Sequence, residues 1–160
     1  MSNQEKQFEE LVTEYRRTIY KVCYFFSKNT AEVEDLFQEV LINLWRGLEG
    51  FRGESSLRTW VWRVSLNTCN ELNRRKQRRI KTIPLEVNIN LYNDEDHESK
   101  QIQKMYERIN RLNYFDRAII LLWLEGMSYE EIGEVVGITL SAVTNRLFRI
   151  KEQLKKMKNL

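Results

Sequence analysis

Apolar residues recur every three or four positions along most of the chain, which is the spacing of the buried face of a helix. In the first half this pattern covers three stretches, residues 4–27, 31–48 and 57–79. Asn29 or Thr30 stands where the second stretch needs an N-terminal cap, and Gly50 to Ser56 reads as a loop with a serine cap. Three helices joined by short connections predict one bundle domain.

The helical pattern is interrupted over residues 80–100. This segment contains Pro84, several asparagines between residues 88 and 93, and the acidic run 94–98, so it reads as a linker. His97 lies within the acidic run, where a solvated loop residue is expected. Helical periodicity resumes over residues 102–112 and again around 119–123.

Residues 126–151 have the pattern of two short helices around a tight turn. Ser128 and Glu131 have the spacing of a capping box, which predicts that the first helix starts near Tyr129. Gly133 would let the second helix approach closely, and Gly137 stands where the turn needs a residue that tolerates positive φ. The pattern therefore predicts a helix-turn-helix, a motif that places its second helix in the major groove of duplex DNA.

The last helix divides into an inward and an outward side. The inward positions form a seam that suits the core of a small domain, with a coiled-coil face as the alternative: Leu140, Val143, Leu147, Ile150, Leu154 and Met157. The outward positions would meet base edges: Ser141, Thr144, Asn145, Phe148 and Arg149. Asn pairs with adenine, Arg with guanine, and Phe can touch a thymine methyl group. Arg146 and Lys151 flank this face and suit phosphates.

Together these patterns predict an all-α chain of two small helical domains. Residues 1–80 would form the three-helix bundle, residues 81–100 a flexible linker, and residues 101–160 a four-helix domain that ends in the helix-turn-helix. The composition agrees, since the single proline and six glycines argue against a fold with many tight turns. An apolar content of 42% is enough for packed cores.

Aromatic and basic residues alternate in the third helix of the first domain. Trp60 and Trp62 lie about 200° apart on a helix, so they cannot both face one core, and one of them should be partly exposed or covered by another element. Exposed aromatics beside arginines suit unstacked bases, and the Gly53 to Ser56 loop could form a pocket for a flipped base. The alternative is that both tryptophans are core or interface residues.

Charge is concentrated in two places. Residues 74–81 hold six basic residues and no acidic one, and residues 140–160 hold six basic residues against Glu152 alone. Such clusters suit phosphate contacts, although a solvated helix end can look the same.

Other kinds of chemistry find little support. One histidine and two cysteines leave no plausible zinc site, and no nucleophile–base pair or glycine-rich phosphate loop can be drawn, so no cofactor and no enzyme activity are expected. Cys23 and Cys69 lie within apolar helical patterns and are expected to be buried thiols, with a disulfide or redox switch as the alternative. A polar N-terminus and the lack of a long apolar run lead us to expect no signal peptide, no membrane span and a cytoplasmic protein.

Three stretches taken together resemble the sigma factors of RNA polymerase, of the small two-domain extracytoplasmic-function (ECF) type. Residues 34–45 (EDLFQEVLINLW) look like the family's polymerase-binding motif, and residues 51–67 (FRGESSLRTWVWRVSLN) look like its promoter −10 segment. Residues 125–133 (EGMSYEEIG) and 143–149 (VTNRLFR) look like its −35 reader. The stretches occur in the family's order and span nearly the whole chain.

The resemblance implies roles for particular residues. Core RNA polymerase would be bound by Asp35, Leu36, Gln38 and Glu39. The opened −10 strand would be held by Phe51, Gly53, Ser55, Ser56, Trp62, Arg63, Asn67, Arg74 and Arg75. The −35 duplex would be contacted by Ser141, Thr144, Asn145, Arg146, Phe148, Arg149 and Lys151. The linker would run toward the RNA exit path, an anti-sigma factor is an expected partner, and the free chain should be a monomer.

The chain departs from the family pattern at several positions. Many members have Leu-Pro before the arginine of the penultimate region, where this chain has Leu112-Asn113-Tyr114-Phe115-Asp116-Arg117. Thr144 stands where a basic residue is common, and Glu71 lies on the promoter-facing stretch. Two other functions remain open on the residues alone, a stand-alone dimeric helix-turn-helix regulator and a protein-interaction adaptor that does not bind DNA.

Overall fold

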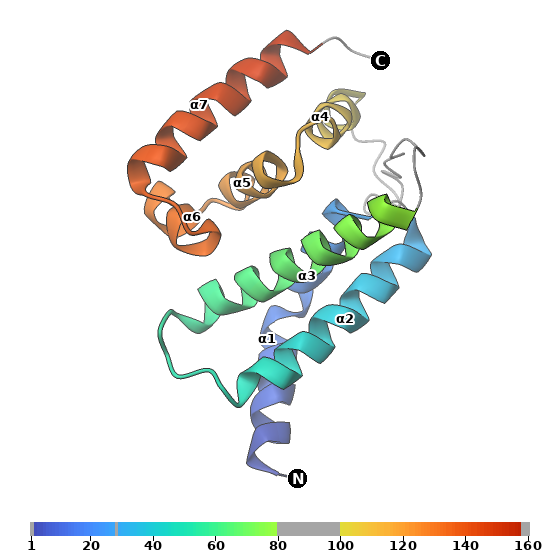
Figure 1. The fold of residues 1–160 in the computed structure, drawn as a ribbon, viewed down its shortest axis with the longest axis vertical. Coiled ribbons are helices and arrows are strands. Elements are labelled where there is room, and N and C mark those ends of the chain that lie inside the picture. Colours follow the sequence, from blue (N-terminus) through green and yellow to red (C-terminus); the bar gives the residue numbers. More distant parts are fainter. Residues whose placement is uncertain (1, 28, 80–99, 158–160) are drawn as a thin grey trace. The chain divides into compact units, whose positions relative to one another are not determined.

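The structure is a computed structural model that describes residues 2–27, 29–79 and 100–157. The chain separates into two compact units, Met1–Glu86 and Val87–Leu160. Every regular element in the described ranges is a helix, as the sequence predicts (Figure 1). The predicted linker 81–100 lies outside these ranges except for Lys100, and so does His97.

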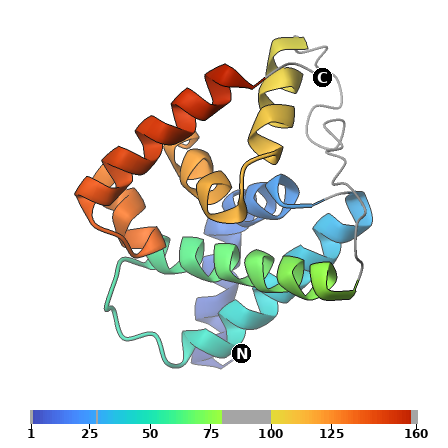
Figure 2. The same cartoon turned by 45° about the horizontal axis from the view of Figure 1, so that its top comes forward.

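Unit 1 is a three-helix bundle of α1 (Asn3–Phe25), α2 (Thr30–Leu48) and α3 (Leu57–Arg79). Each helix packs against the other two (Figure 1, Figure 2). The bundle predicted from periodicity is confirmed, and the helix bounds differ from the predicted ones by two residues at most. The core is formed by apolar side chains from all three helices, among them Leu11, Ile19, Val22, Val33, Val40, Leu44, Val61 and Leu66.

Side-chain caps set where the helices of unit 1 begin. The Asn29 side chain accepts a hydrogen bond from the backbone N–H of Glu32 at 2.9 Å, so Asn29 rather than Thr30 caps α2. Ser56 accepts one from the N–H of Thr59 at 3.1 Å at the start of α3. These bonds satisfy donors that a helix N-terminus otherwise leaves unpaired, so the loop before α3 ends at a defined point.

Unit 2 contains α4 (Lys100–Asn110), α5 (Tyr114–Leu124), α6 (Tyr129–Val136) and α7 (Leu140–Lys156). The predicted capping box is present, because Ser128 and Glu131 exchange hydrogen bonds between side chain and backbone, both at 3.1 Å. Gly137 ends α6 with φ of 79°, the left-handed conformation that the sequence predicts for the turn. The helix-turn-helix is therefore formed by α6 and α7, whose buried side chains meet those of α5.

The two helices of this motif approach closely at Gly133. A Cβ atom placed there would lie 2.7 Å from the carbonyl oxygen of Ile138 and 3.5 Å from a methyl group of Val143. The first distance is too short for a carbon–oxygen contact with backbone, which cannot swing aside. The predicted role of Gly133 follows directly from this geometry.

The inward seam of α7 is shorter than the sequence predicts. Val143, Leu147 and Ile150 are buried, but Leu140 is 49% exposed. Leu140 is the first residue of α7, one turn before the first buried residue of that helix, Val143. The expectation that Leu140 faces inward was wrong, whereas the interpretation of the central seam as core packing is supported.

Cys23 on α1 and Cys69 on α3 are both buried and both free. Their thiols are hydrogen-bonded to each other, and this bond together with burial raises the pKa of the Cys69 thiol well above its usual range. A thiol that is both inaccessible and difficult to ionise reacts slowly, since the thiolate is the reactive form. The structure therefore agrees with the interpretation of the two cysteines as buried core thiols.

We expect both cysteines to resist alkylation in the folded protein. At neutral pH they should react with a thiol reagent only as fast as the chain unfolds, and both should react rapidly in denaturant. A Ser141→Cys variant places a thiol on the exposed side of α7 and serves as the rapidly reacting control. Fast labelling of Cys23 or Cys69 in native buffer would contradict this expectation.

We expect Gly133→Ala to destabilise unit 2 by about 1–3 kcal/mol, because the added Cβ overpacks the contact with the Ile138 carbonyl. Gly50→Ala is the matched control, since a Cβ there meets only the carbonyl oxygen of Gly47 at 3.8 Å, an ordinary contact. Denaturant unfolding followed by circular dichroism gives both values. Equal stability of the two variants would show that α7 can move away from Gly133 without loss.

Candidate nucleic-acid interface

The outward side of α7 is exposed as the sequence predicts. Exposed side chains follow one another at three- and four-residue spacing: Ser141, Thr144, Asn145, Phe148 and Arg149. Phe148 is 67% exposed, an unusual position for a large aromatic side chain that has no packing role. The Thr144 hydroxyl donates to the carbonyl of Leu140 at 3.0 Å, so it can offer only its acceptor capacity to a ligand.

The two cations expected to flank this face have partners inside the protein. The Arg146 guanidinium lies 3.3 Å from a carboxylate oxygen of Asp116 and 4.9 Å from the centre of the Phe115 ring. The ammonium group of Lys151 lies 4.1 Å above the ring of Trp123. Neither contact was foreseen from the sequence. For Arg146 the ion pair speaks against a simple phosphate contact.

Polar bonds at the start of α5 position the surface on which Arg146 rests. Asn113 caps α5 by accepting from the backbone N–H of Asp116 at 2.8 Å. Arg117 is buried and donates to the carbonyls of Asn110 and Leu112 at 3.1 and 3.2 Å. Its burial lowers the pKa of the guanidinium. These bonds join the end of α4 to the start of α5.

In unit 1 the loop before α3 is organised around two aromatic rings that contact each other at a tilt. The Phe51 and Trp60 rings lie 5.0 Å apart at 32°, and both side chains are half-buried. Gly53 has φ of 78°, a conformation that other residues rarely adopt. Ser55 donates to the carbonyl of Ser56 at 3.1 Å, while the Ser56 side chain caps α3. The loop therefore has a defined shape beside an accessible aromatic pair.

The two tryptophans of α3 occupy different surroundings, as the helical geometry requires. Trp62 is only 3% exposed and belongs to the core, whereas Trp60 folds onto Phe51 and the end of α2 at Gly47. The structure thus gives Trp62 a packing role, against the expectation that it contacts DNA. The aromatic surface near the loop comes instead from Phe51 and Trp60.

The rest of the expected −10 set lies along α3. Arg63 is half-buried, and Asn67, Arg74 and Arg75 are exposed. Arg75 is paired with Glu71 at 3.4 Å, but both side chains are more than half exposed, so water and salt screen this pair. These residues are therefore accessible to a ligand along α3.

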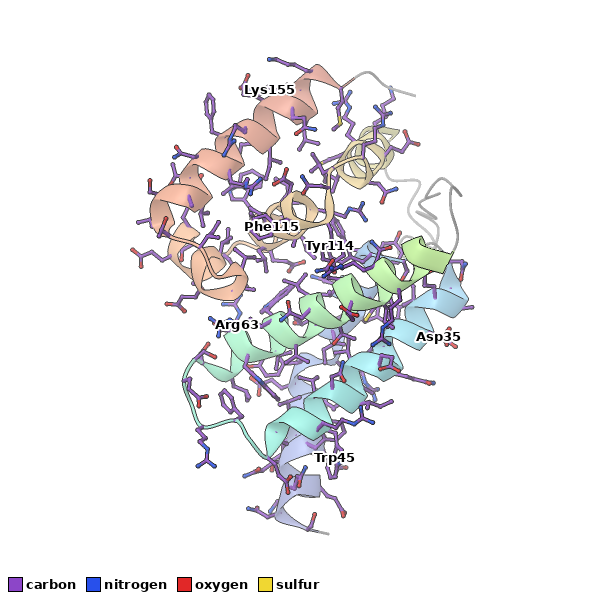
Figure 3. The ribbon with its side chains drawn as sticks, viewed as in Figure 1. Asp35, Trp45, Arg63, Tyr114, Phe115 and Lys155 are labelled. Carbon is purple, nitrogen blue, oxygen red and sulfur yellow. The ribbon has the colours of Figure 1, made fainter. Side chains whose placement is uncertain are left out.

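The residues expected to bind polymerase lie on α2, and some of them are exposed while others are buried. Asp35 and Gln38 are exposed and Glu39 is half-buried, whereas Leu36 is buried in the bundle core. The exposed stripe continues at the same spacing through Ile42 and Trp45, which the sequence analysis did not single out. Figure 3 shows Asp35 toward the start of α2 and Trp45 toward its end.

Trp45 is held by an edge-on contact with Phe8 of α1, at 5.2 Å between ring centres. The signal that could have identified this stripe is the spacing of seven residues from Asp35 to Ile42 and from Gln38 to Trp45, which places two apolar residues on an otherwise polar helix face.

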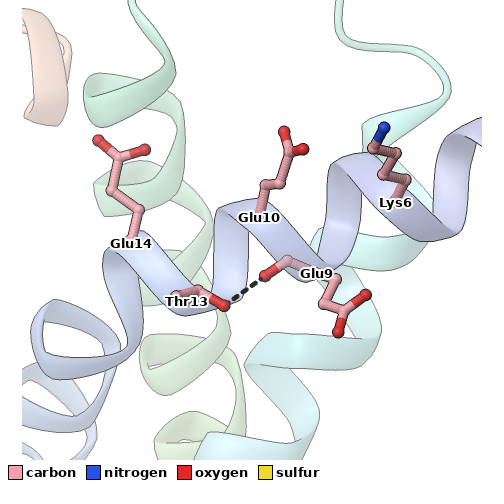
Figure 4. Close-up of a pocket in the computed structure, with 5 residues that line it drawn as sticks. All are labelled: Lys6, Glu9, Glu10, Thr13 and Glu14. Atoms are coloured by element: carbon pink, nitrogen blue, oxygen red, sulfur yellow. Dashed lines mark hydrogen bonds between the residues drawn. The ribbon is translucent and has the colours of Figure 1, made fainter.

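A surface hollow on α1 is lined by Lys6, Glu9, Glu10, Thr13 and Glu14 (Figure 4). The Thr13 hydroxyl donates to the backbone carbonyl of Glu9 at 2.8 Å, which is an ordinary bond within a helix. Within the described ranges, no group of His, Cys, Asp or Glu side chains is arranged to hold a metal ion.

Comparison with known proteins identifies both halves of the chain. A family model of sigma-70 region 2 matches residues 11–79, and one of sigma-70 region 4 matches residues 102–154. The ECF RNA polymerase sigma-E factor of Haemophilus influenzae is 29% identical over 94% of this chain and 87% of its own length. The RNA polymerase sigma-H factor of Pseudomonas aeruginosa is 28% identical over 95% of this chain and 86% of its own.

Solved structures share the fold. The sigma factor RpoE in complex with the anti-sigma factor NepR from Bartonella quintana aligns with a TM-score of 0.72 at 20% identity, covering 94% of this chain and 96% of its own. CnrH in complex with the cytosolic domain of CnrY aligns with a TM-score of 0.70 at 22% identity, covering 94% and 86%.

Truncating a side chain on the buried side of α7 should cost far more unfolding free energy than truncating one on the exposed side. Leu147→Ala should lower the free energy of unfolding by about 2–5 kcal/mol, because Leu147 is fully buried. The neighbouring Phe148→Ala should change it by only about 0.5 kcal/mol or less, because the ring packs against little. Denaturant unfolding compares them. A large loss for Phe148→Ala would mean that this side chain serves the fold.

Proposed function

The chain belongs to the sigma-70 family of RNA polymerase sigma factors, and from this membership we propose how its residues direct promoter-specific initiation as an ECF-type member. The observation that carries the proposal is the match of regions 2 and 4 in that order, with an exposed polar and aromatic side on the second helix of the helix-turn-helix. The family match excludes the dimeric regulator and the adaptor as readings of the whole chain. Sigma factors are not a class of enzymes.

In the proposed −35 complex, α7 lies in the major groove and reads bases with its outward side. Asn145 and Arg149 supply the bidentate hydrogen-bonding groups that suit adenine and guanine, and Phe148 supplies an apolar contact for a thymine methyl group. Ser141 and Thr144 lie one turn earlier and add short polar contacts. Lys151 can reach a phosphate only by leaving the ring of Trp123.

In the proposed −10 complex, the opened strand lies along α3. The Phe51–Trp60 pair offers a stacking surface beside the loop that contains Gly53, Ser55 and Ser56. Arg63, Asn67, Arg74 and Arg75 follow along α3 and supply hydrogen bonds and positive charge. Because Trp62 is buried, its part is to hold α3 in the bundle.

The proposed polymerase-binding surface is the exposed stripe of α2. Asp35 and Gln38 are its polar contacts with Glu39 at the edge, and Ile42 with Trp45 extends it by an apolar end. Leu36 supports the surface from the core. An interface of polar and apolar contacts along one helix suits a subunit that must bind and later leave, since modest interfaces dissociate readily.

We further propose that the chain acts in the cytoplasm as a monomer until it binds core polymerase, and that an anti-sigma factor restrains it. The two solved relatives named above are complexes with an anti-sigma factor and with the cytosolic domain of CnrY, respectively. None of the helices in the described ranges has the length and apolar character needed to cross a bilayer. A pull-down under non-inducing conditions that recovers polymerase but no inhibitor would argue against the anti-sigma partner.

Replacement of a proposed −35 contact should affect only promoters that depend on that element. Arg149→Ala should reduce initiation about 5- to 150-fold there, corresponding to about 1–3 kcal/mol for a bidentate base contact. Gln153→Ala, an exposed neutral position one turn further along α7, is the control. In vitro transcription with core polymerase measures both, on promoters identified by mapping transcripts after overexpression.

Replacement of a proposed polymerase contact should instead weaken every promoter equally. Asp35→Ala and Gln38→Ala should raise the Kd for core polymerase, whereas Glu10→Ala, an exposed carboxylate on α1, should leave it unchanged. Direct binding to core polymerase separates this effect from DNA binding. If the Arg149 and Asp35 variants behaved alike on all promoters, the roles assigned to the two surfaces would be wrong.

A further inference from the structure

Arg146 lies on the helix proposed to read −35 DNA, yet its guanidinium is held by α5. We propose that Asp116 withholds Arg146 from the phosphate backbone, so that Arg146 acts as a positioning residue that fixes α7 against the start of α5 and makes no ionic DNA contact. This inference rests on the proposed function for the role of α7, but the ion pair itself does not.

The Asp116 carboxylate is placed so that it needs a positive partner. Its side chain is only 11% exposed, and one oxygen accepts a hydrogen bond from the Asn113 side chain at 3.2 Å. The other oxygen, Oδ1, is fully covered and accepts no hydrogen bond within the described residues, and the Arg146 guanidinium faces it at 3.3 Å. Removing one partner from such a pair leaves an uncompensated buried charge, which is strongly unfavourable.

Arg146 is held by a second contact as well. Its guanidinium lies 4.9 Å from the centre of the Phe115 ring, within the range of a cation–π interaction. The Arg146 side chain is nevertheless 38% exposed, so DNA on α7 could come near it. Asp116 and a phosphate would then compete for one guanidinium. A phosphate that loses the guanidinium is still neutralised by counterions and water, whereas the covered Asp116 oxygen is not, so the guanidinium stays with Asp116.

The consequence for recognition concerns the neighbours of Arg146 in the chain. Asn145 and Arg149 sit beside it on α7, so the contact with Asp116 limits how α7 can roll or tilt on α5. Because base contacts depend on the placement of α7, the contact favours discrimination between DNA sequences. The contact also removes one cation from the sequence-independent attraction to DNA phosphates.

The salt dependence of DNA binding tests the withheld charge. Each phosphate contact contributes about 0.9 to the slope of log K against log salt. For holoenzyme on a promoter duplex, Arg146→Gln should leave the slope of the wild type unchanged, and Asp116→Asn should steepen it by about 0.9 with tighter binding at low salt. The double variant Asp116→Asn/Arg146→Gln should return to the wild-type slope. A slope lowered by Arg146→Gln alone, or unchanged by Asp116→Asn, would overturn the proposal.

Discrimination tests the positioning role. Arg146→Gln should lower the affinity ratio between the promoter duplex and one with a substituted −35 element several-fold, although the salt slope and the Kd for core polymerase stay constant. A loss of foldedness alone would lower binding to both duplexes equally. An unchanged ratio would refute the positioning role.

A measurement without DNA keeps this inference separate from the proposed function. In thermal unfolding, Asp116→Asn, Arg146→Gln and the double variant should show coupling, with the second change costing less than the first. Additive shifts in Tm would overturn the ion pair. The Asp116 and Arg146 variants could show coupling in Tm while Arg149→Ala has no effect on −35 discrimination. In that case the assignment of α7 to −35 DNA is wrong, but the ion pair between Asp116 and Arg146 is confirmed.

Discussion

Burial of Val143, Leu147 and Ile150 sets the rotation of α7 about its own axis, and the candidate DNA-binding side depends on that rotation. Side chains on a helix are locked to the backbone at 100° per residue, so placing three apolar residues against α5 and α6 leaves Asn145, Phe148 and Arg149 no place but the surface. The close contact between Gly133 and the backbone carbonyl of Ile138 then sets how tightly the turn from α6 into α7 folds back. Core packing and ligand presentation are thus two results of one constraint.

In unit 1 as well, the residues buried in the core set the rotation of a helix, here α3. On α3 the adjacent residues Val61 and Trp62 both point into the bundle, so Trp60 must project to one side. Phe51 covers it, and the loop before α3 takes its shape around this aromatic pair. A packing requirement thereby creates a half-buried aromatic surface next to a row of arginines, which is a suitable site for single-stranded nucleic acid.

Charge in this protein is less available than the sequence suggests. Arg146 and Lys151 both belong to a basic stretch, yet each is engaged by another side chain of the chain. The first of these engagements matters most, because the Asp116 side chain is only 11% exposed and has little access to water as an alternative partner. Net charge and local charge density therefore overstate the number of phosphate contacts that a small DNA-binding unit can make.

Periodicity and capping signals determined the helices, the helix-turn-helix and its outward side from the sequence alone. These features are local, because the 3.6-residue repeat, the Ser128–Glu131 box and the left-handed Gly137 depend only on residues a few positions apart. The sequence also showed that Trp60 and Trp62 could not share one core, but not which of them would be buried.

Only the tertiary structure decided that choice and the exposure of Leu140. It also decided the pairing of Arg146 with Asp116, two residues thirty positions apart that meet only because α7 folds back onto α5. The physical reason is that a side chain's partners are set by where whole helices pack, and packing joins residues that no local pattern connects.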